Sequence, residues 1–355
     1  IVLSVPIMLL SAYMIFMPQG EVTAFYLVFW LFVLYVGWTL LTISHMSWGA
    51  ELTSDYFQRS RVQGSREVLL VLGMVFVLIL PIIAVKLFPD NDPKFVGVAS
   101  MGWFVIILLP IAVWRVPEKP APKPEHVAFR DAVRLLVENR PLRFVLAADL
   151  ISGVSGGIVA SLFLFLANDA FKLTQVQSYQ MLLAYFLSGV AFIPLMLWIS
   201  HRVGKHKAAA LSALFNAVSV PLILLVPEGD VQAALAVWIL CGVNMAAGPF
   251  LFRSIMADVA DHDAVLTKQT RTGLFYSLLT STSKVGAAFA IGLSYWMLDT
   301  IGFKPDGENT QAAIDGLRMV YVWPAVVISV AVGAILWYFP LDEAQQKANR
   351  DILDR

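Results

Sequence analysis

Ten apolar segments follow one another along this chain, each about as long as a helix that crosses a membrane. A helix needs roughly 20 apolar residues to span a hydrocarbon core about 30 Å thick. Backbone groups in lipid must be hydrogen-bonded within their own segment, so helices are expected. The sequence therefore predicts an all-α membrane protein with helices near residues 1–17, 22–50, 66–88, 96–114, 142–167, 177–199, 207–226, 231–256, 272–299 and 317–339.

The composition agrees with a membrane protein and argues against several other classes. Residues are 59% hydrophobic and 14% charged, whereas soluble domains carry about 25% charged residues. A net charge of zero without a long basic run argues against a nucleic-acid partner. The single cysteine, Cys241, can form no disulfide within the chain. The sequence has no nucleophile–base pair, metal cluster or phosphate-binding loop, so we expect no catalytic residues, metal or cofactor.

Lysine and arginine residues fall mainly in alternate loops, and this predicts the orientation of the helices. Of the 25 basic residues, 19 lie in one set of loops and in the C-terminal tail, while five lie in the other set. Loops rich in Lys and Arg remain in the cytoplasm. We therefore expect a multi-pass protein of a bacterial-type inner membrane with a cytoplasmic C-terminus.

A long polar stretch divides the ten segments into groups of four and six. It begins rich in proline and is expected to include an interfacial helix over 126–139. The acids and arginine of 51–66 recur at 258–271, so the helices before them, 22–50 and 231–256, are expected to be equivalent members of two repeats. The helix at 231–256 is the fourth of its group of six. If the helix at 22–50 is also a fourth helix, the intact protein has twelve helices and the first two are missing here. The expected parts are a partial N-terminal bundle at 1–115, a linker at 116–142, a six-helix bundle at 143–340 and a cytoplasmic tail at 341–355.

One cation, Lys284, lies deep inside an apolar segment. It follows Gly273 by 11 residues, which is about 16 Å along a helix and near the middle of a membrane. Ser277, Thr280 and Ser281 share its helix face. An ionisable side chain at this depth is costly and indicates a functional site. The alternative is a structural lysine that pairs with a neighbouring helix or reaches the interface.

Other polar residues of the apolar segments are candidates for substrate contacts. If Asp149 is functional, it pairs with Lys284 or lines a cavity. If it is structural, it bonds to nearby backbone, while Gly153 and Gly157 permit close helix packing. His45 suits proton coupling or a sugar contact, or else packs as a neutral side chain. Side chains that suit either sugar contacts or membrane-interface belts are Trp48, Tyr185, Trp198, Asn244 and Tyr276.

Charged residues at the expected cytoplasmic helix ends form a second group. Exposed ion pairs contribute only about 0–1 kcal/mol each, yet such terms bias an equilibrium between two nearly balanced states. We expect this group to bridge the two bundles when the cytoplasmic side closes, rather than to be only solvated. Its members are Glu51, Asp55, Arg59, Asp258, Asp261 and Arg271.

Two loops carry a resemblance to a known family. One reads W-G-A-E-L-T-S-D at 48–55 and continues to Arg59 and Arg66; the other reads A-D-V-A-D at 257–261 and continues to Arg271, Gly273 and S-K-V-G-A-A-F-A at 283–290. The chain resembles the glycoside–pentoside–hexuronide:cation symporters, the melibiose-permease-like branch of the major facilitator superfamily. The resemblance implies the major facilitator fold with ten of twelve transmembrane helices present. It also implies that Lys284 and Arg66 lie at the sugar and cation sites and that Asp258 and Asp261 belong to a gate.

Departures from that family concern the substrate. The acids on the family's first two helices have no counterpart in this chain. The helix at 22–50 has no acid before Glu51, and near Gly248 the chain lacks the tryptophan that lies beside the sugar in sugar carriers.

The expected function is cation-coupled symport of a sugar or glycoside by alternating access. We expect Na⁺ or H⁺ as the coupling ion, no cofactor, and a monomer surrounded by membrane lipid. The alternatives are a carrier of the same fold for a lysolipid, another amphiphile or another polar solute and, less favoured, a receptor that does not transport. The expected substrate contacts are Lys284, Arg66, Asp149, His45, Tyr276 and Thr280.

Overall fold

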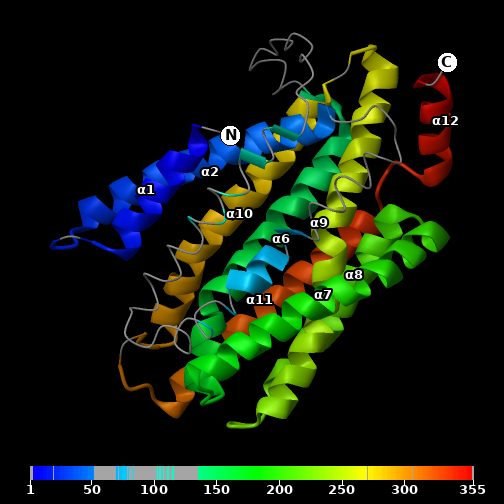
Figure 1. Cartoon of the computed structure of the whole chain (residues 1–355). Helices are drawn as coiled ribbons and strands as arrows, with labels where there is room; N and C mark the ends of the chain where they lie inside the picture. Colours follow the sequence, from blue (N-terminus) through cyan, green and yellow to red (C-terminus); the bar gives the residue numbers. More distant parts are fainter. Residues whose placement is uncertain are drawn as a thin grey trace. The chain divides into compact units, whose positions relative to one another are not determined.

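The computed structural model describes residues 3–18, 20–51, 135–269, 271–305 and 307–353, with scattered positions between 69 and 115. Every element within these ranges is helical, as expected (Figure 1). The chain forms two compact units, Ile1–His126 and Val127–Arg355. Three predicted functional residues, Asp55, Arg59 and Arg66, lie outside the described residues, and of His45 and Glu51 only the helical backbone is described.

The first unit contains α1 (Ser4–Phe16) packed against α2 (Ala24–Glu51). The Tyr26 hydroxyl links them by donating a hydrogen bond to the Met14 carbonyl at 2.7 Å. A side chain at Gly37 would place its Cβ 2.8 Å from Cγ of Met8, so glycine permits the close approach of the two helices.

The second unit is a helical bundle. Side-chain caps begin four of its helices, where Asn139, Thr174, Asp230 and Thr310 each accept a hydrogen bond from a backbone N–H of the first turn. The elements are α6 (Arg140–Phe165), the π-helical η1 (Leu166–Ala170), α7 (Gln175–Val203), α8 (Lys205–Ser219), the 3₁₀ helix η2 (Val220–Leu225), α9 (Val231–Thr267), α10 (Thr272–Thr300), α11 (Gln311–Trp337) and α12 (Glu343–Leu353).

Within the described part of the chain, six helices are long and apolar enough to cross a membrane. They are α2, α6 with η1, α7, α8 with η2, α10 and α11. In α9 the apolar part is shorter, Val231–Met245. Each predicted segment of the second unit coincides with a helix, and the ends differ by a few residues except in α9, which is longer. This confirms a multi-pass, all-α membrane protein.

One prediction about irregular structure was wrong. The segment after residue 256, which was expected to be a loop, continues α9 to Thr267, because no glycine or proline interrupts it. The helix ends where Lys268 takes a left-handed conformation with φ of 56°. The expected tail at 341–355 contains α12, which packs against α9. The acids at 258–263 are therefore held on a rigid helix.

The helices of the second unit pair along their lengths. The closest pairs are α6 with α10, α7 with α9, and α8 with α11 (Figure 1). Two apolar clusters fill the interior, one containing Phe275 and Met256, the other Phe171 and Trp238. The helix that carries Lys284, α10, thus packs mainly against α6.

Candidate functional site

The exposed surface of α10 has a polar stripe and an apolar stripe beside it. Ser277, Ser281 and Lys284 are exposed and share one face, as predicted, whereas Thr280, which was predicted on the same face, is half-buried. The apolar stripe contains Val285, Phe289 and Trp296, with exposed fractions of 60%, 64% and 63%. Lys284 thus lies where a polar surface borders an apolar one, about 18 Å from the start of a helix that can span a membrane.

The ammonium group of Lys284 has no counter-ion among the described residues. The ion pairs recorded for this part of the molecule join other residues, Lys205 with Asp258 and Arg271 with Asp263. Because an intramembrane cation is costly without a partner, it is a candidate for binding a polar or anionic ligand. The prediction that Lys284 binds substrate stays a prediction.

Tyr276 and Thr280 lie on the half-buried side of α10. The Tyr276 hydroxyl donates to the carbonyl of Arg253 on α9 at 3.1 Å. The Thr280 hydroxyl donates to the carbonyl of Tyr276 at 2.9 Å. Both hydroxyl protons are therefore used inside the bundle, which leaves each oxygen only as an acceptor for a ligand.

Asp149 is buried in α6 and contacts α10 on the side away from Lys284. Thr282 donates its hydroxyl proton to a carboxylate oxygen of Asp149 at 2.8 Å. Thr282 and Lys284 are two residues apart, and two residues turn a helix by about 200°. Asp149 is therefore bonded to a side chain of α10, a partner that neither interpretation named, and it points away from Lys284. Its contact with substrate stays a prediction.

Glycines make the α6–α10 contact unusually close. A Cβ at Gly153 would lie 2.7 Å from the carbonyl oxygen of Ser283, and one at Gly157 would lie 2.9 Å from that of Ala287. A Cβ at Gly286 of α10 would collide with the carbonyl oxygen of Leu150. Small residues bring helix backbones together in this way in membranes, as the Gly153–Gly157 spacing predicted.

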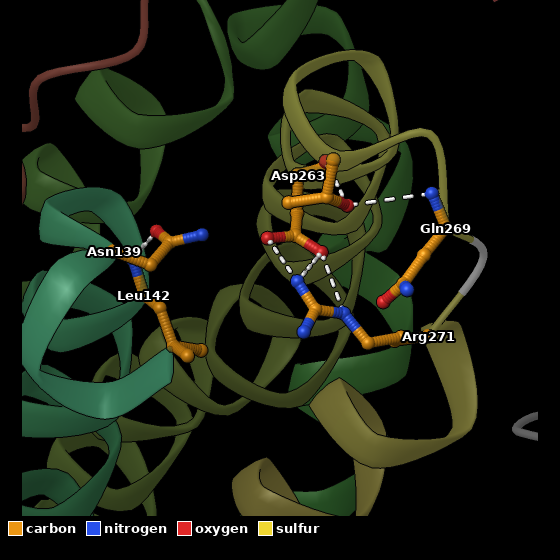
Figure 2. A network of polar contacts seen from close by, with 6 residues as sticks. Asn139, Leu142, Asp263, Gln269 and Arg271 are labelled. Carbon is orange, nitrogen blue, oxygen red and sulfur yellow. Dashed lines mark hydrogen bonds and ion pairs between the residues drawn. The ribbon is translucent and has the colours of Figure 1, made fainter. Parts of the chain in front are cut away.

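An ion pair closes the turn between α9 and α10. The Arg271 guanidinium contacts the Asp263 carboxylate at 2.8, 3.0 and 3.1 Å (Figure 2). Both side chains are well buried, with 13% and 5% of their surfaces exposed. Asp263 was not among the predicted functional residues, although an acid eight residues before Arg271, across a short turn, is the available sequence signal.

The other predicted gate residues of α9 also contact their own unit. Lys205 at the start of α8 pairs with Asp258 at 2.8 Å. The Gln346 side chain of α12 donates to Asp261 at 3.0 Å. Asp258 and Asp261 have further interactions besides these, so the prediction that they bridge two bundles stays a prediction.

A cavity of about 310 Å³ lies inside the second unit, between α6, α7, α8, α9 and α11. No described residue that lines it carries a charge. Tyr185 and Asn244, two of the predicted sugar contacts, both line it, together with Trp238. Hydrogen bonds cross its polar part, from Ser212 to Asn244 at 3.0 Å and from Asn216 to Ser329 at 2.8 Å.

Long apolar helices with a lysine midway along one of them define a polytopic membrane protein. The family model described as MFS/sugar transport protein matches residues 1–343, and the chain belongs to this family. A crystal structure of a variant of the Escherichia coli fucose:proton symporter FucP superposes with a TM-score of 0.60 at 14% identity, covering 96% of this chain and 83% of that one. The fold is therefore the major facilitator fold.

Curated relatives are membrane symporters and carriers. The human sodium-dependent lysophosphatidylcholine symporter 1 is 25% identical over 70% of this chain and 46% of its own length. The glucuronide carrier protein homolog of Escherichia coli K12 is 23% identical over 61% of this chain and 47% of its own. An uncharacterised symporter of Bacillus subtilis, YjmB, is 21% identical over 87% and 68%.

The chain thus spans about half the length of two of these relatives. The narrower assignment to the melibiose-permease-like branch stays a prediction, and so does the absence of two helices.

Proposed function

We propose that the protein is a cation-coupled symporter that carries a sugar or glycoside across the inner membrane. The observation that supports this most is the exposed Lys284, which has no counter-ion among the described residues and lies beside Ser277 and Ser281 on a membrane-length helix. A substrate with hydroxyl or carboxylate oxygens supplies the acceptors that this ammonium group needs. The name of the glucuronide carrier protein homolog agrees with such a substrate, and the name of the sodium-dependent lysophosphatidylcholine symporter agrees with cation coupling.

The proposed mechanism uses binding and movement, without covalent chemistry. Lys284 holds substrate oxygens while Arg66 provides a second cationic contact. A Na⁺ or H⁺ ion favours the loaded cavity, and rocking of the two bundles exposes the site to each side in turn. The charged side chains of Asp258 and Asp261 change partners as the inner side opens, and they contribute small energies to a balanced equilibrium.

A carrier for an amphiphile is the second candidate. It is favoured by the uncharged cavity, whose lining includes Trp238, Tyr185 and Phe163 and which has room for an apolar group. The apolar stripe of α10 next to Lys284 also suits a molecule with one charged and one apolar end. The relatives named as lysophosphatidylcholine symporters agree with this candidate.

The experiment that separates the two candidates is uptake by cells that express the full-length protein. A panel of labelled sugars and glycosides and one labelled lysophospholipid are supplied with and without a Na⁺ or pH gradient. Gradient-driven uptake of a sugar supports the first candidate and identifies its ion. Uptake of the lysophospholipid alone supports the second, and uptake of neither by protein present in the membrane contradicts both.

A further inference from the structure

We infer that Asp149 is a positioning residue: through Thr282 it fixes the rotation of α10 that presents Lys284 on the exposed polar stripe. The inference gives Asp149 a role through another side chain, and its consequence for transport rests on the proposed function. The geometry it concerns is independent of which solute is carried.

The first step concerns the helix contact itself. Gly153, Gly157 and Gly286 bring α6 and α10 so close that a Cβ at any of these positions would overlap the opposite helix. Large rotations of α10 are therefore opposed, because they would bring a side chain into the place of Gly286, against the backbone of Leu150. Within the smaller range that remains, a directional bond between the two helices selects one rotation.

The second step identifies that bond. Asp149 is only 9% exposed, and it lies about 14 Å along α6 from Arg140. The 2.8 Å contact with the Thr282 hydroxyl connects the two helices next to the glycine contact. A buried carboxylate without a donor is unfavourable in a membrane, so rotations of α10 that move Thr282 away from Asp149 are opposed.

The third step links this bond to Lys284. With Thr282 turned towards α6, Lys284 points about 160° away, since two residues turn the helix by about 200°. The apolar Val285 borders the polar stripe. A rotation of α10 within the range that the glycine contact leaves open would therefore move the ammonium group towards the apolar stripe or towards the buried face.

The Thr282 hydroxyl can also donate to backbone carbonyls of its own helix, so the loss of Asp149 and the loss of Thr282 should have different effects. Its hydroxyl also lies 3.1 Å from the carbonyl of Leu278 and 2.9 Å from that of Leu279 in its own helix. Without Asp149, Thr282 can bond within α10, whereas without Thr282 the carboxylate loses its side-chain donor. We therefore expect Thr282→Val to perturb α10 at least as strongly as Asp149→Leu.

The test measures the orientation of α10 without using transport. Ser281→Cys and Val285→Cys are introduced separately into the full-length protein, in a background without other thiols that includes Cys241→Ala, since the native Cys241 is buried. The rate of labelling by a membrane-impermeant maleimide is measured for each. The expected parent labels faster at the polar stripe, in Ser281→Cys, than at the apolar stripe, in Val285→Cys.

Thr282→Val and Asp149→Leu should each lower this ratio of rates at least about threefold, the factor by which one cross-helix hydrogen bond shifts an equilibrium in a membrane. Thr282→Ser and Asp149→Asn, which keep a hydroxyl donor and a carbonyl acceptor, should leave the ratio near the parent value. The Thr282 variants carry the test alone if Asp149→Leu does not reach the membrane.

An unchanged ratio in both Thr282→Val and Asp149→Leu would overturn the positioning role, and so would equal labelling of the two stripes in the parent. Uptake measured on the same variants separates the alternatives. Loss of uptake in Asp149→Leu with a parent-like labelling ratio would instead assign Asp149 a direct contact with substrate or ion. A changed ratio in a protein that transports none of the tested solutes would leave the positioning role standing and contradict only the proposed function.

Discussion

Asp263 and Arg271 form a two-point ion pair that joins the end of α9 to the start of α10. The pair encloses the left-handed turn at Lys268, whose φ is 56°. Figure 2 shows the Asp263 carboxylate facing the guanidinium across this turn, while Asn139 caps α6 nearby. Since α10 carries Lys284, the pair anchors one end of the helix that presents the candidate substrate site.

Removing one member of this pair should destabilise the protein strongly. Breaking a well-buried ion pair leaves one charge uncompensated, which costs about 3–5 kcal/mol. Asp263→Leu and Arg271→Met should each lower the unfolding temperature in detergent, and the double variant should be less affected than either. Asp299→Asn, at the exposed far end of α10, is the control. Equal stability of all variants would contradict the structural role of the pair.

Gly286 should be intolerant of any side chain. A methyl group there would collide with the backbone of Leu150, which cannot move without shifting α6. Gly286→Ala should therefore lower the amount of folded protein and its unfolding temperature. The control on the same helix is Gly292→Ala, because nothing lies within 4 Å of the added Cβ. That change should be neutral or stabilising by up to about 1 kcal/mol, from helix propensity alone.

Arg318 on α11 should be a structural arginine. It donates to the carbonyls of Ala170 at 2.7 Å and Val226 at 3.4 Å, and its guanidinium lies 5.3 Å from the ring centre of Phe171. The side chain thus joins the ends of η1 and η2 to α11. Because Lys lacks the planar fork that reaches two carbonyls, Arg318→Lys should lower stability by about 1–3 kcal/mol.

Thermal unfolding in detergent checks this expectation. Arg202→Lys is the matched control, since the exposed Arg202 stacks on Trp198. Equal losses in the two variants would show that Arg318 has no special role.

The helix α12 should detach more easily than the rest of the second unit. Its described contacts with α9 include hydrogen bonds from Gln346 to Asp261 and between Asn349 and His262, at 3.0 and 3.2 Å. Each contributes about 1 kcal/mol. Gln346→Ala combined with Asn349→Ala should increase backbone hydrogen exchange in α12 before exchange in α9 changes. Gln345→Ala, at an exposed position of α12, provides the control. Unchanged hydrogen exchange of α12 in the double variant would contradict the claim that these hydrogen bonds hold α12 on α9.

The sequence predicted the membrane class and the helices of the second unit because apolar length is a local signal. It also placed Lys284 with Ser277 and Ser281, since helical periodicity alone puts them on one face. The partner of Asp149 could not be predicted, because Thr282 lies 133 residues away and several hydroxyls of α10 were equally available. The continuation of α9 could not be predicted from polarity, because charged residues occur both in loops and in helices that extend beyond the membrane, although residues 257–267 contain no helix-breaking glycine or proline.

The proposed transport function depends most on the assignment of Lys284 to the substrate site. The direct measurement is gradient-driven uptake of the substrate found in the panel, by full-length Lys284→Ala and by Lys304→Ala, whose exposed lysine lies in the turn after α10. We expect Lys284→Ala to reach the membrane in normal amounts and to lose accumulation, while Lys304→Ala accumulates substrate as the parent does. Parent-like uptake by Lys284→Ala would contradict the proposed site.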